Sequence, residues 1–190
     1  MATIKTREEW LNVVLHKHVA KLLKDKSGVA LPKDCKVSVG FPGGGSARKR
    51  IGECWPRQRS SLKVNEIFLN PSMKDVDRLL DVLVHEAIHA ADDCASGHKG
   101  FFRKTAKAVG LEGKMTATVA GPELAGWIVG VRAAMPAFDY GSLDLSGRKK
   151  QTVRMIKHEC AECGAIFRMA AKWSPMQCPC CTDGTLVGGA

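Results

Sequence analysis

The spacing of the cysteines near the end of the sequence restricts the fold of this chain more than any other feature. Four of its eight cysteines form two C-x-x-C pairs that 14 residues separate: Cys160, Cys163, Cys178 and Cys181. The surrounding segment, residues 152–190, is poor in large apolar residues and cannot build much of a core on its own. Four thiolates at this spacing can complete a closed tetrahedral zinc site. The sequence therefore predicts a small β zinc ribbon over residues 152–190.

The fourth ligand of this ribbon is open. Cys181 completes the second C-x-x-C pair with Cys178, whereas Cys180 would bind with tighter local geometry, and we favour Cys181. His158 is a weaker candidate. A redox-active pair is disfavoured, because no thioredoxin-like βαβ pattern surrounds these cysteines. The other cysteines are isolated in the sequence and are interpreted as small, at least partly buried residues: Cys35, Cys54 and Cys94.

A second metal-binding pattern lies in the middle of the chain. Residues 85–89 have the form H-E-x-x-H, which on a helix places His85 and His89 on one face. Zinc suits two imidazoles and an open position, and it lowers the pKa of a bound water to about 7. Glu86 would lie beside that water and could take a proton from it. The motif continues the apolar stripe of a helix, where an unpartnered Glu86 would be costly, and this context favours a catalytic zinc site.

A third protein ligand is needed, and His98 is the best candidate. It follows Gly97, which allows the chain to turn back after the helix, and eight residues separate it from His89. Glu112 and Glu123 are the alternatives. No residue of the sequence stands out as a stabiliser of an oxyanion.

Periodicity and capping signals predict the elements of an α+β domain over residues 1–138. A capping box of Thr6 and Glu9 opens an amphipathic helix that ends at Gly28, and Ser72 is the expected N-cap of a second helix that runs to about Cys94. Three strands are expected at 37–41, 52–55 and 64–69, and two more helices at 100–109 and 122–135. The polar segment 114–121 is a candidate lining of the site. Residues 139–151 are interpreted as a linker to the ribbon.

These motifs resemble those of the SprT-like (Spartan-type) zinc metallopeptidases. That family has H-E-x-x-H, a variable gap and then G-H-G-x-x-F, and here Gly97-His98-Lys99-Gly100 precedes Phe101 and Phe102, so that Lys99 replaces a glycine. Upstream, residues 50–52 (Arg-Ile-Gly) and 66–71 (Glu-Ile-Phe-Leu-Asn-Pro) are similar to the family's R-x-G and I-x-L-N. The resemblance spans residues 10–109 and continues into the tail, where residues 181–186 are similar to a C-G-G-x-L run.

The resemblance implies a zincin-like, mainly helical metallopeptidase domain with a small three-stranded sheet, followed by the ribbon. It implies that the strand at 64–69 lies beside the cleft, where an extended substrate peptide could add to its edge. His85, His89 and His98 would hold the catalytic Zn²⁺, and Glu86 would act as general base and then as acid to the leaving amine. The substrates would be proteins bound or crosslinked to DNA.

The positive charge of the chain is concentrated in two segments. Lys and Arg number 29 against 19 Asp and Glu, a net charge of +10, and segments 46–63 and 147–172 each carry +5. Such segments favour contact with a phosphate backbone, without base specificity and with single-stranded DNA as one option. Trp55 and Trp173 are candidates for stacking on unpaired bases, although packing inside the protein is at least as consistent. The candidate nucleic-acid contacts are Arg48, Lys49, Arg50, Arg57, Arg59, Arg148, Lys149 and Lys150.

Neither a secretory signal nor a membrane span is readable. The first ten residues are polar and charged, and Glu123 and Arg132 interrupt the most apolar stretch, residues 120–135. We therefore expect an intracellular monomer in the cytoplasm and nucleoid, or in the nucleus of a eukaryote, where clustered thiols are typical of metal sites.

The leading hypothesis is a DNA-associated zinc metallopeptidase that cleaves proteins bound or crosslinked to DNA. One alternative is a non-enzymatic nucleic-acid-binding zinc protein, such as an accessory factor of transcription. Glu86 argues against it, because a structural site has no use for a base. Another is a metal-dependent hydrolase with a non-peptide substrate.

Overall fold

The computed structural model describes residues 4–43, 50–147 and 155–188 of the chain. The chain divides into two compact units, Met1–Asp144 and Leu145–Ala190, and each is described here by itself. The first combines helices with small sheets and the second consists mainly of strands, so the α+β class expected from the sequence is confirmed. Among the described residues, no helix is both long and apolar enough to cross a membrane.

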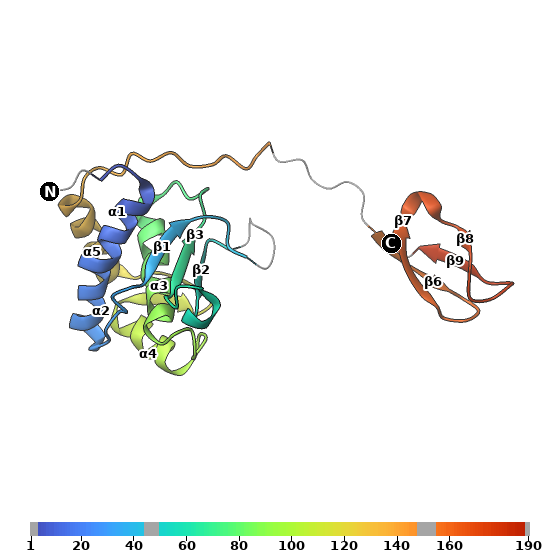
Figure 1. Ribbon diagram of the computed structural model, residues 1–190, viewed down its shortest axis with the longest axis horizontal. Helices are drawn as coiled ribbons and strands as arrows, with labels where there is room; N and C mark the ends of the chain where they lie inside the picture. Colours follow the sequence, from blue (N-terminus) through green and yellow to red (C-terminus); the bar gives the residue numbers. More distant parts are fainter. Residues whose placement is uncertain (1–3, 44–49, 148–154, 189–190) are drawn as a thin grey trace. The chain divides into compact units, whose positions relative to one another are not determined.

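The first unit begins with one continuous helical segment (Figure 1). Helix α1 (Arg7–Val14), a π-helical turn (Leu15–Val19) and helix α2 (Ala20–Ser27) follow one another without a break. The predicted capping box is confirmed, since the N–H of Glu9 donates to the hydroxyl of Thr6 at 3.1 Å and the Glu9 carboxylate accepts from the N–H of Thr6. The segment ends at Gly28 as predicted, with a φ of 71°. The π-helical turn was not predicted.

A three-stranded sheet lies beside these helices, in the order β1-β3-β2. Strand β3 (Glu66–Leu69) pairs in parallel with β1 (Lys36–Val39) and antiparallel with β2 (Gly52–Trp55). The expectation that the strand at 64–69 offers its edge to a substrate is therefore wrong. Both edges of β3 are already hydrogen-bonded, and β2 is the strand that borders the cleft described below.

Helix α3 (Val76–Ala91) forms the centre of the first unit and packs against β2, β3 and α5. Its N-cap is Asp75, whose carboxylate accepts from the N–H of Asp77 at 2.9 Å. The expected N-cap, Ser72, is wrong, because its hydroxyl donates instead to the side-chain oxygen of Asn70. The helix also ends three residues before Cys94. Of its predicted apolar stripe, Val76 is partly buried. The other six residues are fully buried: Leu79, Leu80, Leu83, Val84, Ala87 and Ile88.

Helix α4 (Gly100–Ala108) leads into a short antiparallel hairpin, β4 (Leu111–Lys114) and β5 (Ala117–Ala120). Helix α5 (Pro122–Ala134) follows, with Pro122 in its first turn as expected. The hairpin was not predicted, because its strands are only four residues long and rich in small residues. It matters for the site, since β5 packs against α3.

The segment after α5 stays with the first unit. The Phe138 ring packs on Trp10 and on Tyr140, with centroid distances of 5.0 and 5.1 Å, and the N–H of Leu143 donates to the carbonyl of Pro71 at 3.0 Å. The residues assigned to a linker from the sequence thus include some that pack on this unit. Residues 148–151 of that assignment lie outside the described ranges.

The second unit is a four-stranded antiparallel sheet in the order β7-β6-β9-β8 (Figure 1). Its strands are β6 (Met155–Cys160), β7 (Ile166–Ala170), β8 (Met176–Gln177) and β9 (Thr185–Gly188). The buried apolar cluster at its centre consists of Cys160, Cys178 and Leu186. So small a core agrees with the composition of this segment, which calls for a crosslink to hold the sheet together.

Candidate metal centres

Three histidine side chains converge at the end of helix α3. His85 and His89 lie one turn apart on the helix, and His98 belongs to the turn that follows it. The Nε2 atom of His98 lies 3.3 Å from the Nε2 atoms of both His85 and His89. The structure thus groups the three histidines named from the sequence, while the alternative ligands Glu112 and Glu123 lie outside the group.

The spacing and ionisation of these imidazoles fit a zinc ion. Zinc–nitrogen bonds of about 2.0–2.1 Å at the tetrahedral angle place two ligand nitrogens about 3.4 Å apart, close to the 3.3 Å observed. Burial, reinforced by the neighbouring histidines, lowers the pKa of His85 to about 3 and that of His89 to about 4. Both rings are therefore neutral at pH 7 and offer their lone pairs to an ion. With three protein ligands, a fourth position is left for water or substrate.

The turn after α3 brings His98 back to the helix. Asp93 and Cys94 have left-handed backbone conformations with φ of 54° and 61°, and the N–H of Cys94 donates to the carbonyl of His89 at 2.8 Å. Gly97 has a φ of 54°, which glycine adopts at little cost. The role that the sequence suggested for Gly97 is therefore confirmed, whereas two further left-handed residues were not predicted.

Two more residues support the imidazoles. The buried ring of Phe102 lies 4.7, 4.3 and 5.0 Å from the rings of His85, His89 and His98. Thr118 on β5 places its Oγ1 2.8 Å from Nδ1 of His85. The sequence indicated an aromatic residue at 101 or 102 and a polar lining at 114–121. It did not single out Thr118, because the pairing of the hairpin was not predicted.

Glu86 lies beside the histidines in a cleft of about 460 Å³. Its side chain is almost fully buried, and this burial, helped by the charge of Glu53, raises its pKa to about 8. The Arg50 charge and a hydrogen bond from the N–H of Cys54 oppose that rise. A Cβ at Gly52 would come within 2.7 Å of Glu86 Oε1. The absence of a side chain at Gly52 therefore makes room for the carboxyl group.

The cleft is bordered by β2, α3 and the β4–β5 hairpin. In the part of the chain that the structure describes, two arginines line it, Arg50 and Arg78. Each is paired, Arg50 with Glu53 and Arg78 with Asp81. Each positive charge at the walls thus has an acidic partner beside it.

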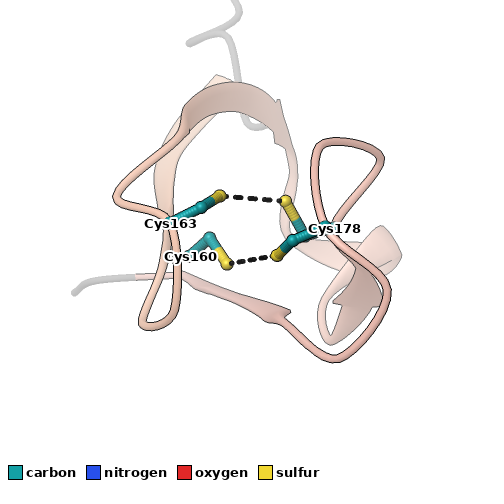
Figure 2. A group of neighbouring side chains, drawn as sticks. Cys160, Cys163 and Cys178 are labelled. Carbon is teal, nitrogen blue, oxygen red and sulfur yellow. Dashed lines mark hydrogen bonds between the residues drawn. The ribbon is translucent and has the colours of Figure 1, made fainter.

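Four of the five cysteines of the second unit form another cluster (Figure 2). The sulfurs of Cys160 and Cys181 lie 3.6 Å apart, and so do those of Cys163 and Cys178. Cys181 rather than Cys180 belongs to the cluster. Cys180 is exposed, and its N–H donates to the sulfur of Cys178 at 3.4 Å. The weaker candidate, His158, lies outside the group.

This thiol cluster also fits zinc. Zinc–sulfur bonds of about 2.3 Å at the tetrahedral angle place two sulfurs about 3.8 Å apart, and 3.6 Å is observed. A Cβ at Gly184 would collide with the sulfurs of Cys160 and Cys181, so the backbone closes tightly around the cluster. The two groups, three imidazoles and four thiols, can each hold a metal ion such as Zn²⁺.

The cysteines that are isolated in the sequence lie close together in the structure. The thiol of Cys94 donates to the carbonyl of Cys54 at 3.5 Å, and both residues line the cleft. The hydrogen bond with the side chain of Cys94 and the burial of the thiol both raise the pKa of Cys54. Burial raises the pKa of Cys35 to about 12, with smaller contributions from Asp34 and Cys94. Their interpretation as buried or partly buried residues is confirmed.

The candidate nucleic-acid contacts are only partly visible. Arg50 lines the cleft, Arg57 lies 4.0 Å from the carboxylate of Asp93, and Arg59 borders a hollow with Phe41 and Trp55. The other five lie outside the described residues: Arg48, Lys49, Arg148, Lys149 and Lys150.

Both candidate tryptophans are at least partly exposed. Trp55 is 38% exposed and Trp173 is 59% exposed, and the Lys172 ammonium lies 5.0 Å from the Trp173 ring centre. Neither ring is therefore sequestered in a core.

Compared with known proteins, the chain has no significant match to a protein-family model, to a curated protein sequence or to a solved structure. Its function must therefore be inferred from its own residues.

Proposed function

We propose that this chain is a zinc-dependent peptidase of the SprT-like type that acts on proteins bound or crosslinked to DNA. The first unit would be the zincin-like catalytic domain and the second a zinc ribbon. The observation that carries the proposal is the carboxyl group of Glu86, buried in a cleft beside three converging imidazoles. A site that served only to stabilise the fold would not require a buried acid at that point.

His85, His89 and His98 would hold the catalytic ion, and the four clustered cysteines would hold a structural one. When bound, zinc supplies an activated water and polarises the scissile carbonyl group. The closed cluster of four thiolates leaves no open position, so its ion would only stabilise the second unit.

Glu86 would move the proton in the reaction. The positive charge of a bound zinc ion would lower the pKa of Glu86 from about 8, so that the ionised carboxylate could accept a proton from the attacking water and then donate it to the leaving amine. The hydrogen bond from the N–H of Cys54 and the space left by Gly52 hold the carboxyl group at the base of the cleft. These contacts orient the group before a substrate arrives, which is the condition for efficient general-base catalysis.

A peptide substrate is favoured because the cleft is bordered by an edge strand. An extended peptide can add to such an edge through main-chain hydrogen bonds. The N–H of Cys54 already donates to the Glu86 carboxylate, and its carbonyl already accepts from the thiol of Cys94, so neither group pairs with a substrate. Pairing would therefore centre on Gly52, whose backbone faces the same edge by the alternation of the strand. A non-peptide hydrolase would have no use for this edge.

A DNA-associated substrate is supported by charge and by exposed aromatic rings. The chain has a net charge of +10. Trp55, with Arg59 beside it, and Trp173, with Lys172 over its ring, each combine an aromatic face with a cation. That combination suits single-stranded nucleic acid, in which unpaired bases stack and phosphates need positive charge.

The test is cleavage of a protein crosslinked to single-stranded DNA by the full chain and its Glu86→Gln variant. We expect Glu86→Gln to keep its zinc and to lose cleavage by a factor of at least about 100. Glu112→Gln is the matched control, because Glu112 is an exposed acid outside the histidine group, and it should cleave at the wild-type rate. Cleavage by Glu86→Gln at the wild-type rate would refute the proposed mechanism. DNA binding without cleavage by any variant would favour the non-enzymatic alternative.

A further inference from the structure

The contact between Thr118 and His85 connects the β4–β5 hairpin to the histidine group. We propose that Thr118 is a positioning residue that fixes the ring of His85 for metal binding. The inference rests on the proposed zinc site, and it assigns a function to the hairpin. Thr118 is 4% exposed, and its Oγ1 lies 2.8 Å from Nδ1 of His85. On the other side of the same ring, Nε2 faces His98.

The chemistry of imidazole gives this contact a direction. A histidine that binds a metal through Nε2 carries its proton on Nδ1, and that N–H needs an acceptor. The hydroxyl of Thr118 is placed to accept it. A hydroxyl can donate or accept, so the ion, by taking the Nε2 lone pair, sets the direction of this bond. With Nδ1–H donating to Oγ1, the bond holds the ring in the orientation in which Nε2 faces His98.

A partly buried ion pair holds Thr118 in place. The guanidinium of Arg78 donates to the carbonyl of Thr118 at 2.8 Å and to both carboxylate oxygens of Asp81 at 2.7 and 2.8 Å. Asp81 in turn accepts from the N–H of Ala120 at 3.3 Å. Arg78 and Asp81 lie on α3, the helix that carries His85. One helix therefore supplies both the ligand and the clamp that fixes the position of its hydrogen-bond acceptor.

The clamp also fixes the register of β5. Successive side chains of a strand point to opposite faces, so a slip by one residue would replace the hydroxyl with one of the neighbouring side chains. Those neighbours, Ala117 and Val119, are exposed and carry no acceptor. A slip by one residue in either direction would therefore leave Nδ1 of His85 without an acceptor.

The test measures zinc affinity in the full chain by competition with a chelator of known affinity. Zinc is expected to leave the two sites in two steps of the competition curve. The step that is missing in a His98→Ala variant belongs to the histidine site, and the other step, from the cysteine cluster, is an internal reference. Thr118→Val keeps the shape of the side chain and removes the acceptor. We expect it to weaken zinc binding at the histidine site about 10- to 100-fold, while Thr118→Ser should stay within about threefold of wild type.

Thr105→Val is the matched control, because Thr105 is also a buried threonine but lies in α4 and outside the histidine group. It should leave both zinc steps unchanged. Equal affinities of Thr118→Val and wild type at the histidine site would overturn the inference and leave the proposed peptidase intact. A wild-type chain with no histidine-dependent zinc step would overturn both.

Discussion

Replacement of Gly52 by alanine tests how closely strand β2 approaches the proposed general base. A Cβ at this position would lie 2.6 Å from Cγ1 of Val82 and 2.7 Å from Oε1 of Glu86. Unstrained contacts between such atoms are about 3.5–4.0 Å. The strand or the carboxyl group must therefore move by about 1 Å.

The size of the effect follows from that displacement. A misplacement of about 1 Å in a catalytic group can cost a factor of about 100 in rate. Overpacking of a tight interior costs about 1–3 kcal/mol of folding free energy. We expect Gly52→Ala to lower kcat/KM about 100-fold and to lower the free energy of unfolding by about 1–3 kcal/mol. Zinc should remain bound, because the atoms nearest to the new methyl group belong to Val82 and Glu86 and not to the three histidines.

The assay compares cleavage of a DNA-crosslinked protein, urea unfolding and zinc content. Gly126→Ala is the control, because a Cβ added there would meet nothing within 4 Å apart from its chain neighbours and the backbone of its own helix. Gly126 lies inside α5, so its replacement should be neutral or stabilise the fold by up to about 1 kcal/mol. If Gly52→Ala has wild-type kcat/KM and wild-type stability, the close approach of β2 to Glu86 is refuted.

Three further predictions concern other parts of the chain. Gly184→Ala should remove the zinc of the second unit, because its methyl group would collide with the sulfurs of Cys160 and Cys181, and elemental analysis should then find one ion fewer per chain. Leu83→Ala should lower the free energy of unfolding in urea by about 2–5 kcal/mol, since Leu83 is fully buried in α3, and a loss below about 1 kcal/mol would contradict this packing. Cys35, whose pKa burial raises to about 12, should resist iodoacetamide at pH 8 until the chain unfolds, as peptide mass mapping can check.

The metal-binding residues could be predicted because their spacing in the sequence alone restricts where they can meet. H-E-x-x-H on a helix puts His85 and His89 on one face whatever surrounds them. The apolar stripe of α3 and the capping box at Thr6 were equally local signals, and each appears in the structure. The bounds of the helices were predicted less exactly, since the N-cap of α3 is Asp75 instead of Ser72.

The long-range contacts could not be predicted. Which strand lies at the sheet edge depends on how β1, β2 and β3 pair, and the alternation inside each strand does not determine that order. For the same reason the sequence did not show that Thr118 reaches His85, or that Cys54 and Cys94 meet beside the cleft. These contacts join residues 33 and 40 positions apart.

The zinc content of the purified full chain, measured by elemental analysis, tests the central claim most directly. Two zinc ions per chain are predicted. His98→Ala should retain one ion and lose cleavage, and Cys160→Ser should retain one ion at the histidine site. A single ion in the wild-type chain, or two ions retained by His98→Ala, would contradict the assignment of a catalytic zinc to the three histidines.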